Sequence, residues 1–129
     1  PFGNSLVVKT MTGAQIKALL EQQFDSGSNT VASPRVLLPS RSLRYSYSLS
    51  APAGARISDM ALNGTAMSDG ASYRVTMNSF LATGGDNFTV FNQGTDTLGG
   101  DQDVDALEAY IKANSPLVPP ATNRITALP

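Results

Sequence analysis

Histidine and cysteine are both absent from this sequence of 129 residues. Without cysteine, no disulfide can stabilise the fold and no thiolate can bind a metal. Histidine is the commonest neutral metal ligand and the usual general base near neutral pH. A metal site would therefore need oxygen ligands alone, which argues against zinc-dependent catalysis within this chain. We expect no catalytic residue and no metal ligand here.

Charge is scarce as well. Charged residues make up 15% of the chain and the net charge is −1. Binding to nucleic-acid polymers depends on clustered Lys and Arg, so that class of partner is not expected. The sequence contains no run of about 18 apolar residues, so it predicts no membrane-spanning helix. The sequence starts at Pro1 and continues directly into a strand-like segment, so we expect a piece of a longer protein.

The first half of the chain carries two clear elements. Residues 5–10 (SLVVKT) are rich in β-branched residues and predict a strand. Thr12 and Gln15 then have the spacing of a capping box, in which each side chain satisfies the other's backbone amide. Apolar side chains follow at helical spacing, at Ile16, Leu19, Leu20 and Phe24. We expect this helix to end near residues 25–27, followed by a loop over residues 28–40.

The second half alternates between strand and helix signals. Strands are expected at residues 43–49, 56–62 and 73–77, with a hairpin turn at Asn63-Gly64 and a short return over 65–67. Residues 92–100 predict a polar, Gly-rich loop. A second helix capped by Asp101 or Asp103 should end near residues 114–116, with a last short strand around 124–126. The pattern predicts a single α+β domain with a mixed or antiparallel sheet and two main helices.

The segment TMNSFLATGGDNF, residues 76–88, is the most unusual stretch of the chain. Asn78 ends a strand, Phe80 follows, and the two glycines of Gly84-Gly85 lead to Asp86. Glycines let a ligand approach the backbone closely, and strand ends are common places for binding residues. From composition alone, Phe80 as a core residue and Asp86 as a turn residue is the simpler interpretation.

Two further segments are ambiguous. Phe2, between Pro1 and Gly3, is either an aromatic platform for a ligand or part of a fraying terminus or core plug. The alternating aspartates of DQDVD, residues 101–105, are similar to part of a calcium loop, but the Gly and Glu that an EF-hand needs are missing. Capping of the following helix explains these aspartates better.

Four of these segments together resemble the C-terminal domain of bacterial and animal 5′-nucleotidases. PFGNSLVVKTMTGAQIKALLEQQF is similar to the PFGN-strand-TGxQLxxxLE start of that domain, and LRYSYSLSAPAGARI with its LNG turn to the middle. YRVTMNSFLATGGDNFTVF resembles the signature YxVxxNxFLAxGGDGF, and GDQDVDALEAYI the start of the last helix. The resemblance runs from Pro1 to about Arg124, in the family's order and spacing, and implies the family's α+β fold over residues 1–129.

The resemblance also implies a binding mode. In the family, two phenylalanines stack on either side of the nucleobase, and these fall on Phe2 and Phe80; the aspartate that binds the ribose hydroxyls falls on Asp86. The same motif adds Asn78, Gly84 and Gly85 as substrate-binding positions. Where the family has a Gly after this aspartate, this chain has Asn87. Asn tolerates positive φ angles, so we expect the loop to keep its path.

The parent protein implied by the resemblance is a secreted, periplasmic or cell-surface hydrolase that converts nucleoside 5′-phosphates to nucleoside and phosphate. Two divalent ions, commonly zinc, are expected in an N-terminal metallophosphoesterase domain, the partner of this one, and the upstream part of the present domain is expected to be missing. This chain alone should be inactive. Alternatives are the same domain in a UDP-sugar hydrolase, a 2′,3′-cyclic nucleotide phosphodiesterase or a thiohydrolase, or a non-catalytic binding module.

Overall fold

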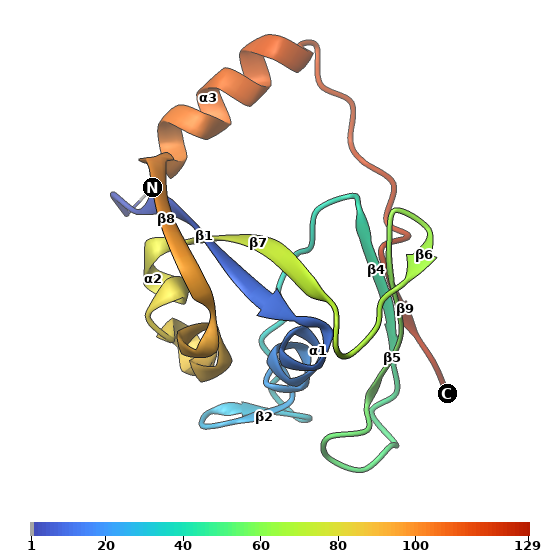
Figure 1. The fold of residues 1–129 in the computed structure, drawn as a ribbon. Helices are drawn as coiled ribbons and strands as arrows, with labels where there is room; N and C mark the ends of the chain where they lie inside the picture. The colour runs from blue at the N-terminus through green and yellow to red at the C-terminus, as the bar shows by residue number, and fades with distance from the viewer. Residues whose placement is uncertain (1) are drawn as a thin grey trace.

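The fold, in a computed structural model that describes residues 2–129, combines two main β-sheets with three α-helices (Figure 1). Pro1 lies outside the described residues. One sheet has three strands in the order β7-β1-β8, the other has four in the order β6-β5-β4-β9, and β2 and β3 form a separate hairpin. The α+β class expected from the sequence is confirmed.

The three-stranded sheet has β1 (Ser5–Thr12) at its centre, as expected from its β-branched residues. On one side β1 pairs antiparallel with β7 (Ser72–Asn78), in a register that places Leu6 opposite Asn78. On its other side it pairs antiparallel with β8 (Thr95–Gln102). The register brings the start of β1 and the end of β7 to the same edge of the molecule.

The predicted loop over residues 92–100 is wrong, because most of it belongs to β8. This strand has no alternation of apolar and polar residues, and all its residues are exposed. Its pairing with β1 is made by backbone hydrogen bonds, which do not depend on side-chain type. The register shifts twice along this pairing, once next to Gly99-Gly100 and once between Thr95 and Leu98, where Asp96 has a positive φ angle.

Helix α1 (Gly13–Glu21) follows β1 directly, and the predicted capping box is present. The Thr12 hydroxyl accepts from the Gln15 amide at 3.1 Å, and the Gln15 side chain accepts from the Thr12 amide at 2.9 Å. The helix ends earlier than expected, with Gln22 as its C-cap. Beyond it, Gln23 and Phe24 donate to the carbonyls three residues back, which tightens the chain into the hairpin of β2 (Asp25–Ser26) and β3 (Asn29–Thr30).

The four-stranded sheet is formed by β4 (Leu43–Tyr47), β5 (Ile57–Leu62), β6 (Thr65–Ala66) and β9 (Ile125–Ala127). Strands β4, β5 and β6 are antiparallel neighbours, and the Asn63-Gly64 turn joins β5 to β6 as expected. Strand β9 pairs with β4 in parallel, which makes this sheet mixed.

The hydrophobic core lies between the two sheets and α1. Each large side chain buried in this way contributes roughly 1.5–3 kcal/mol to stability. Phe24 and Tyr47 stack with ring centroids 5.3 Å apart, which joins the segment after α1 to the four-stranded sheet. The core consists of twelve buried side chains: Met11, Ile16, Leu19, Leu20, Phe24, Tyr45, Ile57, Met77, Ala82, Phe88, Val90 and Phe91.

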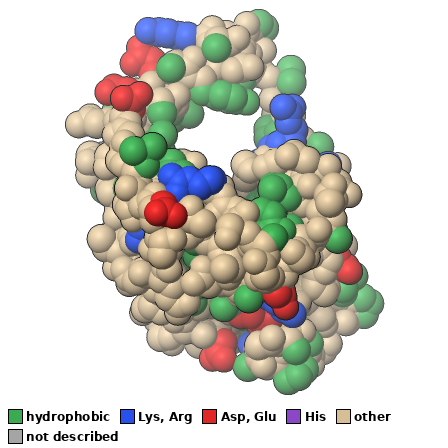
Figure 2. All heavy atoms as spheres, viewed as in Figure 1, with side chains coloured by type: hydrophobic (Ala, Val, Ile, Leu, Met, Phe, Trp, Pro, Cys, Tyr) green, Lys and Arg blue, Asp and Glu red, His purple; other side chains and the backbone are tan. Residues whose placement is uncertain are grey.

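Helix α3 (Asp103–Asn114) stands apart from this core. Gln102 is its N-cap and makes no capping bond through its side chain, so the prediction of an Asp101 or Asp103 cap is wrong. Asp103 instead lies in the first turn with Asp105, where a carboxylate is favoured by the helix dipole. Figure 2 shows an opening between α3, the segment after it and the rest of the molecule. Across residues 2–129, no helix has the length and apolar character needed to cross a membrane.

Candidate functional site

The candidate site is built on the short helix α2 (Ser79–Ala82), which begins where β7 ends. Asn78 is its N-cap: its Oδ1 accepts a hydrogen bond from the Leu81 amide at 2.8 Å. The predicted site residue Asn78 therefore fixes the start of this helix. Phe80, on the first turn, is 47% exposed, so its ring is not a core residue.

Phe2 is joined to this helix through Asn4. The Ser79 hydroxyl donates to Asn4 Oδ1 at 3.0 Å and accepts from the Ser5 amide at 3.1 Å. Phe2 precedes Asn4 by two residues, and an extended chain of two residues spans at most about 7 Å. Phe2 is 97% exposed, which makes its ring almost fully accessible. Two phenylalanines 78 positions apart thus lie on segments that are hydrogen-bonded to each other.

The loop after α2 has an unusual backbone. Gly84 has φ +86°, Asp86 has φ +56° and Asn87 has φ +66°. The 3-10 turn η1 (Gly85–Asn87) therefore contains two consecutive residues other than glycine in the left-handed region. Such residues store strain and persist only where the surrounding structure holds them.

Hydrogen bonds from the hairpin of β2 and β3 hold this loop in its conformation. Asn29, only 2% exposed, donates through Nδ2 to the carbonyl of Asp86 at 2.8 Å and to that of Gln22 at 3.1 Å. The Ser26 hydroxyl donates to the carbonyl of Asn87 at 2.7 Å. The Asn87 side chain returns a bond to the Ser28 hydroxyl at 3.0 Å. Asn87, which departs from the resembled motif, is thereby part of the clamp on this loop.

The carboxylate of Asp86 forms an ion pair with Arg35. Arg35 Nη1 lies 3.0 Å from Asp86 Oδ2, and both side chains are partly exposed. Sequence reasoning missed Arg35, because residues 51 positions apart leave no local pattern when they pair. Within residues 2–129, no other hydrogen bond reaches the Asp86 carboxylate.

Arg35 is placed by a polar contact beneath it. The Arg35 amide donates to the carbonyl of Gln23 at 3.0 Å, and the Leu37 amide donates to Gln23 Oε1 at 2.8 Å. Gln23 is fully buried and also bonds the hydroxyl of Tyr45. Burial raises the pKa of this Tyr45 hydroxyl above its usual value of 10.0, and the hydrogen bond with Gln23 opposes part of that rise.

Gly85 lies directly against the ring of Phe80. A Cβ built on Gly85 would come within 2.6 Å of two ring carbons of Phe80. Real Cβ atoms do not approach carbon atoms this closely. Glycine at position 85 is therefore what allows the ring to rest over the loop, and this places Phe80 beside the segment that carries Asp86.

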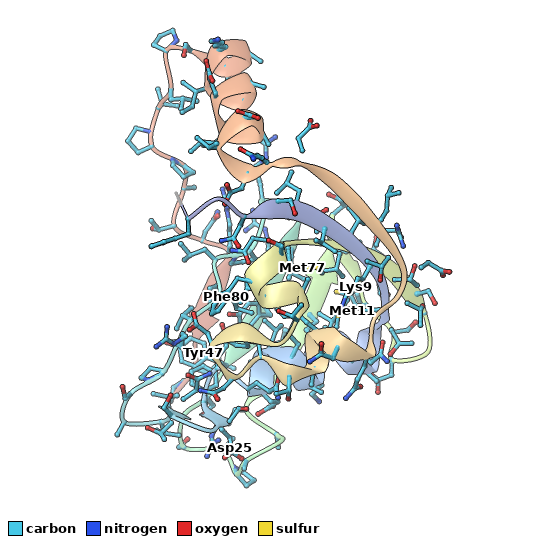
Figure 3. All side chains as sticks on the ribbon, turned by 90° about the vertical axis from the view of Figure 1, so that its left-hand side faces the viewer. Lys9, Met11, Asp25, Tyr47, Met77 and Phe80 are labelled. Carbon is cyan, nitrogen blue, oxygen red and sulfur yellow. The ribbon has the colours of Figure 1, made fainter. Side chains whose placement is uncertain are left out.

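Lys9 joins α2 to β1 from the buried side. It is only 8% exposed, and its Nζ donates to the carbonyls of Ala82 at 2.7 Å and Phe91 at 2.9 Å. In the view of Figure 3, Phe80 lies on the side of α2 away from Lys9 and Met11. The helix thus has an anchored inner face and an outer face that presents Phe80.

A metal centre does not fit the side chains of this chain. Histidine and cysteine are absent from the sequence, and within residues 2–129 no three Asp or Glu side chains gather closely enough to hold an ion. The site is consequently made of aromatic rings, a carboxylate, a guanidinium and glycine backbone. These groups can bind and orient a flat, hydroxylated molecule.

Comparison with known proteins gives the family. Residues 1–93 match the family described as "5'-nucleotidase, C-terminal domain". The "5'-nucleotidase-related protein" of Glossina morsitans morsitans is 33% identical over an alignment of 137 residues, covering 99% of this chain and 24% of that protein. The "Trifunctional nucleotide phosphoesterase protein YfkN" of Bacillus subtilis (strain 168) is 35% identical over 99 residues, covering 72% of this chain and 6% of that protein.

The solved structures agree with this assignment. The 5'-nucleotidase precursor of Thermus thermophilus superimposes with a TM-score of 0.85 at 35% identity, covering 99% of this chain and 26% of that structure's chain. The chain thus spans about a quarter or less of the length of these relatives. Matched over most of its length by the family's sequence pattern and over nearly all of it by a member's structure, this chain belongs to the 5′-nucleotidase C-terminal domain family.

Proposed function

We propose that this chain is the nucleoside-binding domain of a 5′-nucleotidase-type phosphoric monoester hydrolase. One observation carries the proposal: the hydrogen bonds of Ser79 with Asn4 and Ser5 bring the segments of Phe2 and Phe80 together where β1 begins and β7 ends. Both rings are exposed there, and the Asp86 loop adjoins Phe80. An exposed aromatic pair beside a carboxylate suits a nucleobase linked to a sugar.

In the proposed complex, the base stacks between Phe2 and Phe80. Base–aromatic stacking contributes about 1–3 kcal/mol per contact and tolerates different bases. The Asp86 carboxylate accepts hydrogen bonds from the two ribose hydroxyls. Gly84 and Gly85 leave the backbone accessible where the nucleoside approaches. Two contacts at the middle of this range contribute about 4 kcal/mol together, which corresponds to a dissociation constant of about 1 mM.

Hydrolysis is proposed to take place in a separate N-terminal metallophosphoesterase domain of the parent protein. No residue of this chain is expected to hold the metal ions; two divalent ions bound in that domain would supply an activated water and neutralise charge on the phosphate. The present chain contributes orientation: it holds the nucleoside so that the 5′-phosphate reaches those ions. We expect it to have no hydrolytic activity alone. Export of the parent protein is part of the proposal, supported by the description of the Thermus thermophilus relative as a precursor.

Titration with adenosine, followed by amide and side-chain NMR shifts of the 129-residue chain, tests the proposal. We expect saturable shifts that cluster at residues 2–5, 79–81 and 84–87. The Phe2→Ala and Phe80→Ala variants should each weaken binding at least about fivefold, because each loses one stacking contact. Tyr110→Ala, which removes another exposed aromatic ring, on α3, should bind as the unmodified chain does. Shifts that cluster elsewhere, or equal binding by all three variants, would refute the proposal.

A further inference from the structure

Arg35 is a residue of the candidate site that neither the sequence motif nor the family comparison assigns. Its guanidinium lies 3.0 Å from Oδ2 of Asp86 and leaves Oδ1 without a partner among residues 2–129. We propose that Arg35 is a positioning residue for ribose recognition: it holds one carboxylate oxygen of Asp86 so that the other faces the sugar hydroxyls. This inference rests on the proposed function, because it concerns the same nucleoside.

Hydrogen bonds fix the main chain at both partners of this ion pair. The main chain at Asp86 is fixed by Asn29, which donates to its carbonyl at 2.8 Å. The main chain at Arg35 is fixed by Gln23, through the bonds of residues 35 and 37. Pro34 restricts the chain further by locking its own φ. The ion pair therefore joins two segments that are already placed, and it has little backbone freedom left to lose.

The side chain of Asp86 is the part that those backbone bonds leave free. A carboxylate at a partly exposed loop otherwise samples several rotamers, and each rotamer turns its oxygens differently. An arginine beside it selects one rotamer, because N–H donors attract the ionised oxygen. A vicinal diol needs an acceptor in one fixed direction. Preselection of that direction lowers the ordering cost when the sugar binds.

A charge effect alone would give a different result from a positioning effect. If Arg35 only added positive charge, any nearby cation would replace it, and affinity for the bare base would change as well. If it positions Asp86, its loss should weaken binding of ligands that carry the 2′ and 3′ hydroxyls and leave stacking unchanged. The comparison of adenosine, 2′,3′-dideoxyadenosine and adenine therefore separates the two roles.

The experiment measures dissociation constants of these three ligands for the 129-residue chain and its Arg35→Gln, Arg35→Lys, Arg41→Gln and Asp86→Ala variants. For the unmodified chain we expect adenosine to bind at least about tenfold more tightly than the dideoxy compound, which lacks both hydroxyls, because one charged hydrogen bond alone allows that factor. In Arg35→Gln this ratio should fall by up to about fivefold, the range of a partly exposed ion pair. The ratio in Arg35→Lys should lie between those of Arg35→Gln and the unmodified chain. The dissociation constant of adenine should not change in either variant.

The controls make each failure distinct. Arg41 is exposed and makes no ion pair within the described residues, so Arg41→Gln should keep the full ratio. In Asp86→Ala the ratio should approach one. If adenosine binds more tightly than the dideoxy compound by the same factor in the unmodified chain and in Arg35→Gln, the role of Arg35 is overturned. That result would leave the ribose role of Asp86 intact. If the unmodified chain itself does not distinguish the two nucleosides, the ribose role of Asp86 fails, and this inference fails with it.

If Arg35→Gln disturbs the loop, the amide shifts of residues 84–88 will move before any ligand is added. Arg35→Lys then decides the matter, because it retains a cation at this position with less directional hydrogen bonding. An intermediate ratio with unchanged loop shifts supports positioning. A ratio equal to that of the unmodified chain shows that any cation suffices, and overturns it.

Discussion

Replacing Gly85 with alanine should separate nucleoside binding from folding. The added Cβ would lie 2.6 Å from two carbons at the outer end of the Phe80 ring, whereas non-bonded carbon atoms prefer about 3.5–4.0 Å. The ring must therefore move by about 1 Å or more. Phe80 is half-exposed, so it can rotate into solvent without disturbing the core. The substitution should therefore displace the Phe80 ring and leave the fold intact.

The expected effect on stability is small. Gly85 is not among the residues with positive φ, so alanine can adopt its backbone conformation. Alanine in place of a compatible glycine stabilises a protein by about 0.4–1 kcal/mol through the unfolded state, which offsets the cost of moving the ring. Urea unfolding should therefore give a free energy within about 1 kcal/mol of that of the unmodified chain.

The expected effect on binding is large. Loss of one stacking contact of about 1–3 kcal/mol weakens adenosine binding by about 5- to 150-fold. Isothermal titration or NMR should thus find no saturation at concentrations that saturate the unmodified chain. Gly70→Ala is the matched control, because its Cβ would meet open space and its φ is not positive. Unchanged affinity in Gly85→Ala, with a displaced Phe80 ring, would refute the stacking role of that ring.

Three further changes test the supports of the site. Replacing Lys9 with methionine removes two buried hydrogen bonds and should lower the free energy of unfolding by about 2 kcal/mol, measured by urea titration. Asn29→Ala leaves the carbonyl of Asp86 without its donor, so it should cost about 2 kcal/mol and also weaken adenosine binding. The pKa of the Tyr45 hydroxyl is raised in the folded state, so its neutral form stabilises the fold fully below pH 10, and this stabilisation is lost as pH rises through the raised value. Tyr45→Phe should abolish this alkaline loss of stability in unfolding experiments. An unchanged pH profile in Tyr45→Phe would contradict the role of Tyr45.

The elements that local patterns specify were predictable from the sequence. The capping box of Thr12 and Gln15 and the Asn63-Gly64 turn depend on neighbours within a few residues, and both are present. Strand β8 was missed because its formation depends on the free edge of β1, a partner about 90 positions away, and not on its own side chains. At the end of α1, which comes earlier than expected, the Gln22 side chain bonds Thr89 and Val90, contacts that no local pattern in the sequence reveals.

The site residues differ in the same way, since some lie in a local motif and others come from distant parts of the chain. Phe80, Asp86 and the glycines before Asp86 lie in one continuous motif, so resemblance to the family could identify them. Arg35 and Asn29 act on Asp86 from more than 50 positions away, and only the folded chain brings them to it. Asn78 was expected to bind substrate, and that stays a prediction; the structure shows its side chain capping α2.

Intermolecular NOEs between adenosine and the two phenylalanine rings measure the central relationship most directly. With Phe2 and Phe80 labelled, we expect ring protons of both residues to lie close to the same protons of the base, and the ribose protons to lie close to residues 84–87. NOEs from the base to only one ring, or to side chains of the core or of α3, would contradict this expectation.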